Sequence, residues 1–130
     1  MPHYTFSVGF FDGAVQEQKG GCGFRLWLDE THSYNCWMGV DYCTNNFTKL
    51  VAAWALLHWA KQLNIKDIRI FGDSQVVIDW LDGRVGLHSI KLHHWCARIK
   101  KLLTFFSHVS FCHVFIVNTI GMLILFLRRD

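Results

Sequence analysis

The sequence of 130 residues has a single proline and no Pro/Ser-rich or low-complexity stretch, so nothing in it marks a linker between two domains. Its five cysteines form an odd set without a Cys-x-x-Cys pair, which indicates neither a disulfide framework nor a zinc knuckle. The first residues lack the basic and apolar segments of a signal peptide. We therefore expect an intracellular protein, in the nucleus or cytoplasm and not secreted, with free thiols.

Charges are scarce as well, at 18% of all residues. Thirteen Lys and Arg residues against ten Asp and Glu residues leave a net charge of +3, a mild excess that permits a polyanionic partner without requiring one. Hydrophobic residues, in contrast, make up 52% of the chain and aromatic residues 15%. This composition can fill the core of one domain, which argues against intrinsic disorder and against a disulfide-dependent miniprotein.

The longest apolar run, residues 114–127, is shorter than the about 20 residues that a membrane-spanning helix needs. It is also interrupted by Asn118 and Gly121. A membrane is therefore not an expected partner. The least favoured interpretation of the chain is a fragment held at a membrane by its apolar tail.

Hydrophobic periodicity predicts an α/β fold with a mixed sheet. Apolar residues alternate over 4–10, and a glycine-rich stretch leads into two further strands, 24–28 and 33–40, which predicts an antiparallel meander. Capping residues and apolar spacing predict five further elements: a helix that begins after Thr44 and ends at Asn64, a strand at 67–71, helices ending near Gly83 and Leu102, and a strand at 109–115.

Two carboxylates, Asp12 and Asp73, follow strand-like runs and are expected at the ends of strands. A carboxylate among aromatic strand residues and glycine is costly to bury alone, so each should be hydrogen-bonded, paired with a cation or bound to a metal. Each residue taken by itself favours a turn or capping role, because Asp before Gly or Ser is ordinary turn chemistry.

Four motifs in order resemble the ribonuclease H type 1 (RNase H-like) domain, most closely its plant retroelement-derived, reverse-transcriptase-like branch. They are Phe-Asp-Gly-Ala at 11–14, Thr-Asn-Asn at 44–46, Gly-Asp-Ser at 72–74 and His-Val at 113–114. The resemblance covers residues 4–115 and implies a five-stranded mixed sheet flanked by helices. It also implies hydrolysis of the RNA strand of an RNA/DNA hybrid with two Mg²⁺ ions as cofactors. We expect no small-molecule cofactor and a monomer.

The resemblance makes Asp12 and Asp73 the catalytic residues and metal ligands, but the two other acids of the family are absent. Lys49 stands where the family motif Thr-Asn-x-x-Ala-Glu-Leu has its Glu, and we place the fourth position at Met122. Exchanging a negative for a positive charge removes an oxygen donor and adds repulsion toward a dication. Occupancy by Mg²⁺ is therefore doubtful, and we expect cleavage to be weak or absent.

Residues 116–130 depart from the Arg-Glu-x-Asn-x-x-Ala-Asp-x-Leu motif that ends the family pattern. The codons permitted from Ile116 onward, read one frame later, can spell that motif at the family's spacing. We therefore interpret 1–115 as the RNase H-like domain and 116–130 as a frame-shifted remnant of the last helix, produced by a mutation or by a mistaken gene model. The alternative is a genuine core element.

The resemblance also indicates residues for nucleic-acid binding. Asn45 and Asn46 match family positions that touch the minor groove and read RNA 2′-hydroxyls. Lys91 and Lys100 belong to the main basic concentration, on or beside the third predicted helix, and are candidates for phosphate contact, with a solvated helix face as the equal alternative. A non-catalytic nucleic-acid-binding module is therefore the second interpretation, beside the ribonuclease.

Overall fold

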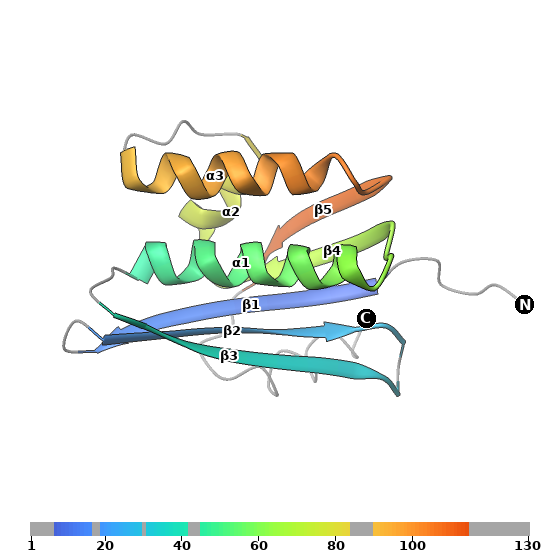
Figure 1. Cartoon of the computed structure of the whole chain (residues 1–130), viewed down its shortest axis with the longest axis horizontal. Helices are drawn as coiled ribbons and strands as arrows, with labels where there is room; N and C mark the ends of the chain where they lie inside the picture. The colour runs from blue at the N-terminus through green and yellow to red at the C-terminus, as the bar shows by residue number, and fades with distance from the viewer. Residues whose placement is uncertain (1–6, 17–18, 30, 42–44, 84–89, 115–130) are drawn as a thin grey trace, which may run out of the picture.

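The computed structural model describes residues 7–16, 19–29, 31–41, 45–83 and 90–114, and within them five strands and three helices (Figure 1). The strands are β1 (Ser7–Gln16), β2 (Lys19–Trp27), β3 (Ser33–Asp41), β4 (Asp67–Gly72) and β5 (His108–His113). The helices are α1 (Asn45–Gln62), α2 (Gln75–Leu81) and α3 (Ile90–Leu103). The predicted α/β class and the order of the elements are confirmed.

The strands form one mixed sheet in the order β3-β2-β1-β4-β5. Short connections join β1, β2 and β3 into the predicted antiparallel meander. β4 pairs in parallel with β1 on one side and with β5 on the other, and helices α2 and α3 supply the crossover from β4 to β5. The five-stranded mixed sheet implied by the resemblance is therefore present.

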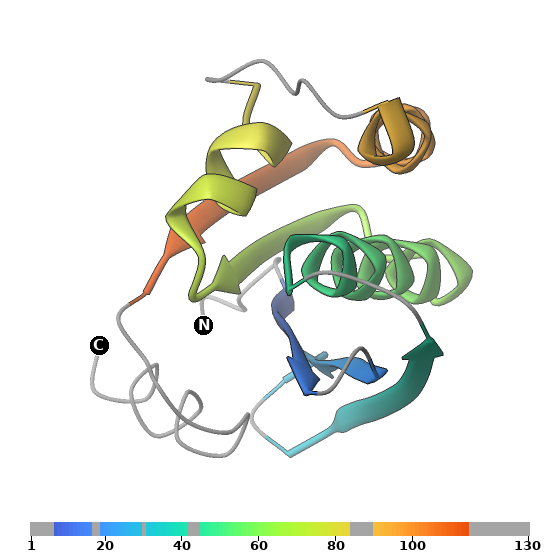
Figure 2. The same ribbon diagram turned by 90° about the vertical axis from the view of Figure 1, so that its left-hand side faces the viewer.

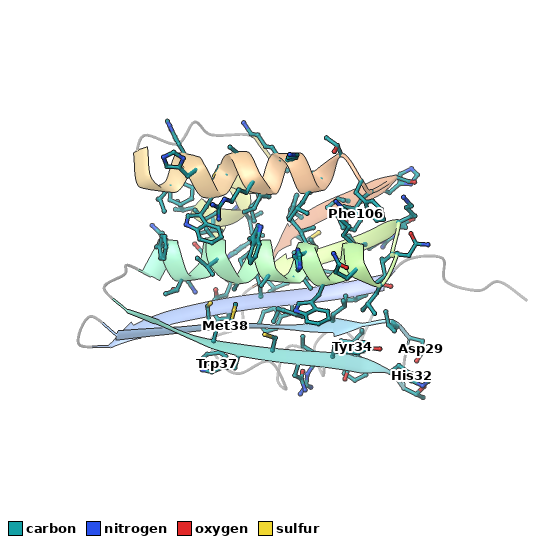
Figure 3. The ribbon with its side chains drawn as sticks, viewed as in Figure 1. Asp29, His32, Tyr34, Trp37, Met38 and Phe106 are labelled. Carbon is teal, nitrogen blue, oxygen red and sulfur yellow. The ribbon has the colours of Figure 1, made fainter. Side chains whose placement is uncertain are left out.

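The first two strands are longer than predicted, which corrects the position expected for Asp12. β1 and β2 pair from Val8 opposite Trp27 to Gln16 opposite Lys19, so Asp12 lies inside a strand. The glycine-rich stretch belongs to β2 because the ring of Trp37 on β3 packs onto it: a Cβ at Gly23 would lie 2.5 Å from that ring. In Figure 3, Trp37 lies on the side of β3 away from α1.

Helix α1 lies between the sheet and α3 (Figures 1 and 2). Its side chains are buried on more than one face, since Leu50, Leu56 and Leu57 are fully buried together with several of its alanines. A helix covered from two sides has no single apolar stripe. Burial on both sides holds α1 firmly against β1, and this placement positions the candidate site.

None of the described helices is long and apolar enough to cross a membrane. Residues 115–130, with Met122 among them, lie outside the residues that the structure describes. The boundary at residue 115 and the frame-shift interpretation of 116–130 therefore stay predictions.

Candidate active site and nucleic-acid interface

Asp12 lies where β1 loses one of its two neighbours. The parallel pairing of β1 with β4 ends at Phe10 opposite Phe71, while the pairing with β2 continues through Asp12 opposite Gly23. Phe11 beside it is almost fully buried, but the Asp12 side chain remains 30% exposed. Its Oδ1 accepts a hydrogen bond of 2.8 Å from the backbone N–H of Gly13.

Asp73 follows directly after β4, in the turn that leads into α2. Ser74 caps α2, because its hydroxyl oxygen accepts a hydrogen bond from the N–H of Val77 at 3.4 Å. The carbonyl of Asp73 lies 3.1 Å from Nε2 of His113 at the end of β5. The turn is therefore attached to the neighbouring strand β5 through His113.

Lys49 reaches the same place from α1, because the first turns of this helix lie very close to β1. A Cβ at Gly13 would lie 2.5 Å from Oγ1 and 2.8 Å from the carbonyl carbon of Thr48, which is itself fully buried. Only glycine permits this approach. The contact between Thr48 and Gly13 sets the distance of Lys49 from Asp12. The sequence did not predict this contact.

The Lys49 ammonium group bridges the two carboxylates. Its Nζ donates one hydrogen bond to Oδ1 of Asp12 and another to Oδ1 of Asp73, each 2.8 Å long. The three side chains are largely covered, with exposed fractions of 14% for Lys49, 30% for Asp12 and 25% for Asp73. Both aspartates are paired with a cation, one of the roles foreseen for them, and Asp12 is also hydrogen-bonded by the backbone of Gly13.

Lys49 keeps its positive charge in this environment. Burial acts to lower the pKa of its ammonium group, but the hydrogen bonds to Asp12 and Asp73 and their negative charges raise that pKa by more, to above its ordinary value of 10.5. A charged ammonium has no lone pair with which to accept a proton. Lys49 is therefore unsuited to the role of general base at neutral pH.

The donor set does not fit the two divalent ions that the resemblance implies. A hard dication needs anionic or carbonyl oxygens, and the place between the two carboxylates already holds a positive nitrogen with no acceptor capacity. In the described ranges, no three His, Cys, Asp or Glu side chains converge to form a metal site. Lys49, predicted to stand at a degraded ligand position, thus places a positive charge between the two carboxylates, and its descent from a metal-ligand position stays a prediction.

The residues predicted for nucleic-acid binding are spread over two helices. Asn46, half-buried, belongs to the first turn of α1 and lies one turn before Lys49; Lys100 is exposed in the last turn of α3. The two helices run side by side, with Trp95 of α3 against Phe47, so Lys100 lies toward the opposite end from Asn46 (Figure 1).

The other two predicted binding residues are placed by their backbone alone. Asn45 is the first residue of α1, and Lys91 is the second residue of α3. Their side chains lie outside what the structure describes. The structure thus brings Asp12, Asp73 and Lys49 together and leaves the basic residues of α3 as a separate surface.

Comparison with known proteins agrees with this fold. The Reverse transcriptase-like family matches residues 10–116, and the chain belongs to this family, whose fold is RNase H-like. No curated protein matches the chain. The plant retroelement-derived origin stays a prediction.

Solved structures of RNase H proteins share the fold. RNase H1 from the halophilic archaeon Halobacterium salinarum is 28% identical, with a TM-score of 0.77 over 84% of this chain and 85% of that one. The N-terminal RNase H domain of a Mycobacterium tuberculosis protein is 20% identical, with a TM-score of 0.80 over 84% and 86%. LC11-RNase H1, solved in complex with an RNA/DNA hybrid, is 15% identical, with a TM-score of 0.75 over 83% and 84%. These proteins show that the chain has the RNase H fold, a fold whose members work with divalent metal ions.

Proposed function

We propose that this RNase H-like domain binds RNA/DNA hybrids and has lost most or all of the two-metal cleavage activity of its family. The observation that carries the proposal is the position of Lys49, with its ammonium group 2.8 Å from a carboxylate oxygen of both Asp12 and Asp73. The family supports the nucleic-acid ligand, since LC11-RNase H1 was solved with an RNA/DNA hybrid. The site chemistry supports the loss of cleavage.

The charges around the site explain why the domain can still bind nucleic acid after it has lost the ability to cleave it. Two carboxylates and one ammonium sum to −1, whereas four carboxylates would sum to −4, so nucleic-acid phosphates meet much less repulsion here in the absence of metal. A dication, in contrast, would have to displace Lys49 or lie beside it. Phosphate binding therefore needs no divalent ion in this chain, while cleavage loses the ions that stabilise the reacting oxygens.

Two helices offer groups for the hybrid. Asn46, at the beginning of α1, is placed one turn from the site and suits a contact with a 2′-hydroxyl in the minor groove. Lys100 and Lys101, exposed in the last turn of α3, suit contacts with phosphates, which add affinity without reading sequence.

The test is a binding titration with a fluorescent RNA/DNA hybrid in EDTA, followed by a cleavage assay with Mg²⁺ and with Mn²⁺. Binding should persist in EDTA and weaken steeply with salt. Lys100→Gln should reduce the slope of log affinity against log salt by about 0.9, and Arg25→Gln, on strand β2 and away from α3, should leave that slope unchanged.

Three results would contradict the proposal or a part of it. Absence of hybrid binding at low salt would remove the nucleic-acid ligand altogether. Efficient Mg²⁺-dependent cleavage of the RNA strand would instead favour an active ribonuclease, the function that the family implies. The convergence of Asp12 and Asp73 is the observation that supports this second candidate. Equal affinity for hybrid and duplex DNA would remove the role of Asn46 in reading the 2′-hydroxyl.

A further inference from the structure

Asp12 and Asp73 come from different parts of the sheet but converge on one nitrogen atom. Asp12 belongs to β1 and Asp73 to the turn after β4, and the Lys49 ammonium donates to an oxygen of each at 2.8 Å. Lys49 is the most deeply covered of the three, with 14% of its side chain exposed. The carboxylate oxygens of Asp12 and Asp73 therefore stabilise a positive charge at the position of this nitrogen.

Each aspartate has a second contact that does not involve Lys49, Asp12 through its carboxylate and Asp73 through its backbone carbonyl. The N–H of Gly13 donates to Asp12, and the backbone of Asp73 is linked to His113 on β5. These contacts would keep the Asp12 carboxylate and the backbone of Asp73 in place after loss of the ammonium group. Two partly buried negative charges would then face each other without compensation, an arrangement that costs stability and attracts a cation.

We propose that Lys49 is a tethered counter-ion that takes the place of a divalent cation, and that removal of its ammonium group converts Asp12 and Asp73 into a binding site for one divalent ion. The carboxylate oxygens are hard donors of the kind that Mg²⁺ and Mn²⁺ prefer, with water completing their coordination. The chain as it stands needs no divalent ion for its folding, because the positive charge is covalently attached. This role of Lys49 requires no nucleic acid and goes beyond hybrid binding.

The experiment compares the full chain with Lys49→Ala and with Lys61→Ala as a matched control. Lys61→Ala removes the same charge from the same helix at an exposed position away from the carboxylates. Melting temperatures are measured in EDTA, in MgCl₂ and in NaCl of equal ionic strength. Binding of Mn²⁺ is measured directly by electron paramagnetic resonance.

Lys49→Ala should melt at a lower temperature than the unchanged chain in EDTA and recover most of the difference in MgCl₂, but not in the matched NaCl. It should bind Mn²⁺ at least about tenfold more tightly than the unchanged chain, because the competing positive charge is gone. The unchanged chain and Lys61→Ala should respond to MgCl₂ only as they respond to NaCl.

A double variant keeps the test decisive where Lys49→Ala alone folds poorly. Lys49→Ala with Asp73→Asn carries one negative charge fewer, so it should fold better in EDTA than Lys49→Ala and lose the gain in Mn²⁺ affinity. The proposal is overturned if the unchanged chain binds Mn²⁺ as tightly as Lys49→Ala, or if Lys49→Ala shows neither loss of stability nor gain of Mn²⁺ affinity. Neither result bears on hybrid binding, which the titration in EDTA tests separately.

Discussion

Gly13 controls how closely helix α1 approaches strand β1. The space that a Cβ would need at this position is filled by the backbone and side chain of Thr48. Thr48 cannot move away easily, because it is fully buried and belongs to a helix held on two sides. The residue that follows it is Lys49, so the distance between the ammonium group and Asp12 depends on the absence of one methyl group.

Gly13→Ala should therefore destabilise the chain by about 1 to 3 kcal/mol, the usual cost of overpacking a rigid contact. Gly39→Ala is the control, because a Cβ at Gly39 has no neighbouring atom within 4 Å. Urea denaturation of both variants measures the difference in free energy of unfolding. Equal stability of the two variants would mean that α1 can shift without cost.

Asp29 stabilises the turn between β2 and β3 through its charge (Figure 3). The N–H groups of Thr31 and His32 donate to its Oδ1 at 2.8 and 2.9 Å. The backbone bond from Thr31, followed by the side-chain hydrogen bonds with His32 and Thr31, holds the pKa of Asp29 well below its ordinary value of 3.8. Because the pKa is lowered on folding, the contribution to stability is complete above about pH 4 and is lost as the pH falls below that value.

Asp29→Asn tests this pH dependence, since the amide oxygen can still accept both hydrogen bonds while the charge is gone. The free energy of unfolding of the unchanged chain should exceed that of the variant at pH 6, and the difference should shrink below pH 4. Denaturation curves at a series of pH values measure it. A difference that stays constant from pH 6 to pH 2.5 would show that the charge does not contribute.

At the scale of the elements, aromatic contacts join α1 to α3. The ring of Trp95 on α3 meets Phe47 edge-on at 5.9 Å and Trp54 at 5.4 Å, and the guanidinium of Arg98 lies 5.1 Å from the centre of the Trp95 ring. Such aromatic and cation–π pairs stabilise a contact by more than the burial of their apolar surface alone would provide. α3 is thereby held beside the helix that carries Lys49.

Trp95→Ala should lower the free energy of unfolding by about 2 to 4 kcal/mol, because a large half-buried ring with two aromatic partners is removed. Trp59→Ala is the matched control on α1, with a side chain that is 46% exposed, and should cost less than about 1 kcal/mol. Chemical denaturation measures both. Similar costs for the two variants would mean that the α1–α3 contact does not depend on Trp95.

At the scale of the whole molecule, the family's chemistry depends on several distant positions acting together. The site joins β1, α1 and the turn after β4, and the fourth position predicted by the resemblance, Met122, belongs to the C-terminal segment outside the described residues. Ligands that act as a unit are strongly non-additive. Restoring one of them should therefore have little effect.

The corresponding prediction is a rescue. Lys49→Glu combined with replacement of residues 116–130 by Arg-Glu-His-Asn-Arg-Asn-Ala-Asp-Ser-Leu-Ser should restore cleavage of the RNA strand of a hybrid in Mg²⁺, whereas each change alone should yield little or none. Adding Asp12→Asn should abolish the restored activity. Product formation on a labelled hybrid measures it, and a folded double variant that stays inert in Mg²⁺ and Mn²⁺ would mean that Asp12 and Asp73 are not remnants of a catalytic site.

The local periodicity of the sequence was sufficient to determine the order and type of the elements, because alternating and helical spacing are properties of neighbouring residues. The identity of the two aspartates and the loss of an acid at Lys49 were also visible, since motifs in order require no structure. The ends of β1 and β2 were not. The glycine-rich stretch has the local signature of a turn, and only its packing beneath Trp37 of another strand places it inside the sheet.

Only the tertiary structure decided what Lys49 does. In the sequence, Lys49 only marks the position where an acidic ligand is missing, and no neighbouring residue indicates which group its charge pairs with. Residues 12, 49 and 73 are separated by 37 and 24 positions, so their meeting depends on the pairing of β1 with β4 and on the close approach of α1 at Gly13. Contacts of that range are set by the packing of whole elements, which is why the bridge between the two carboxylates appears only in the folded chain.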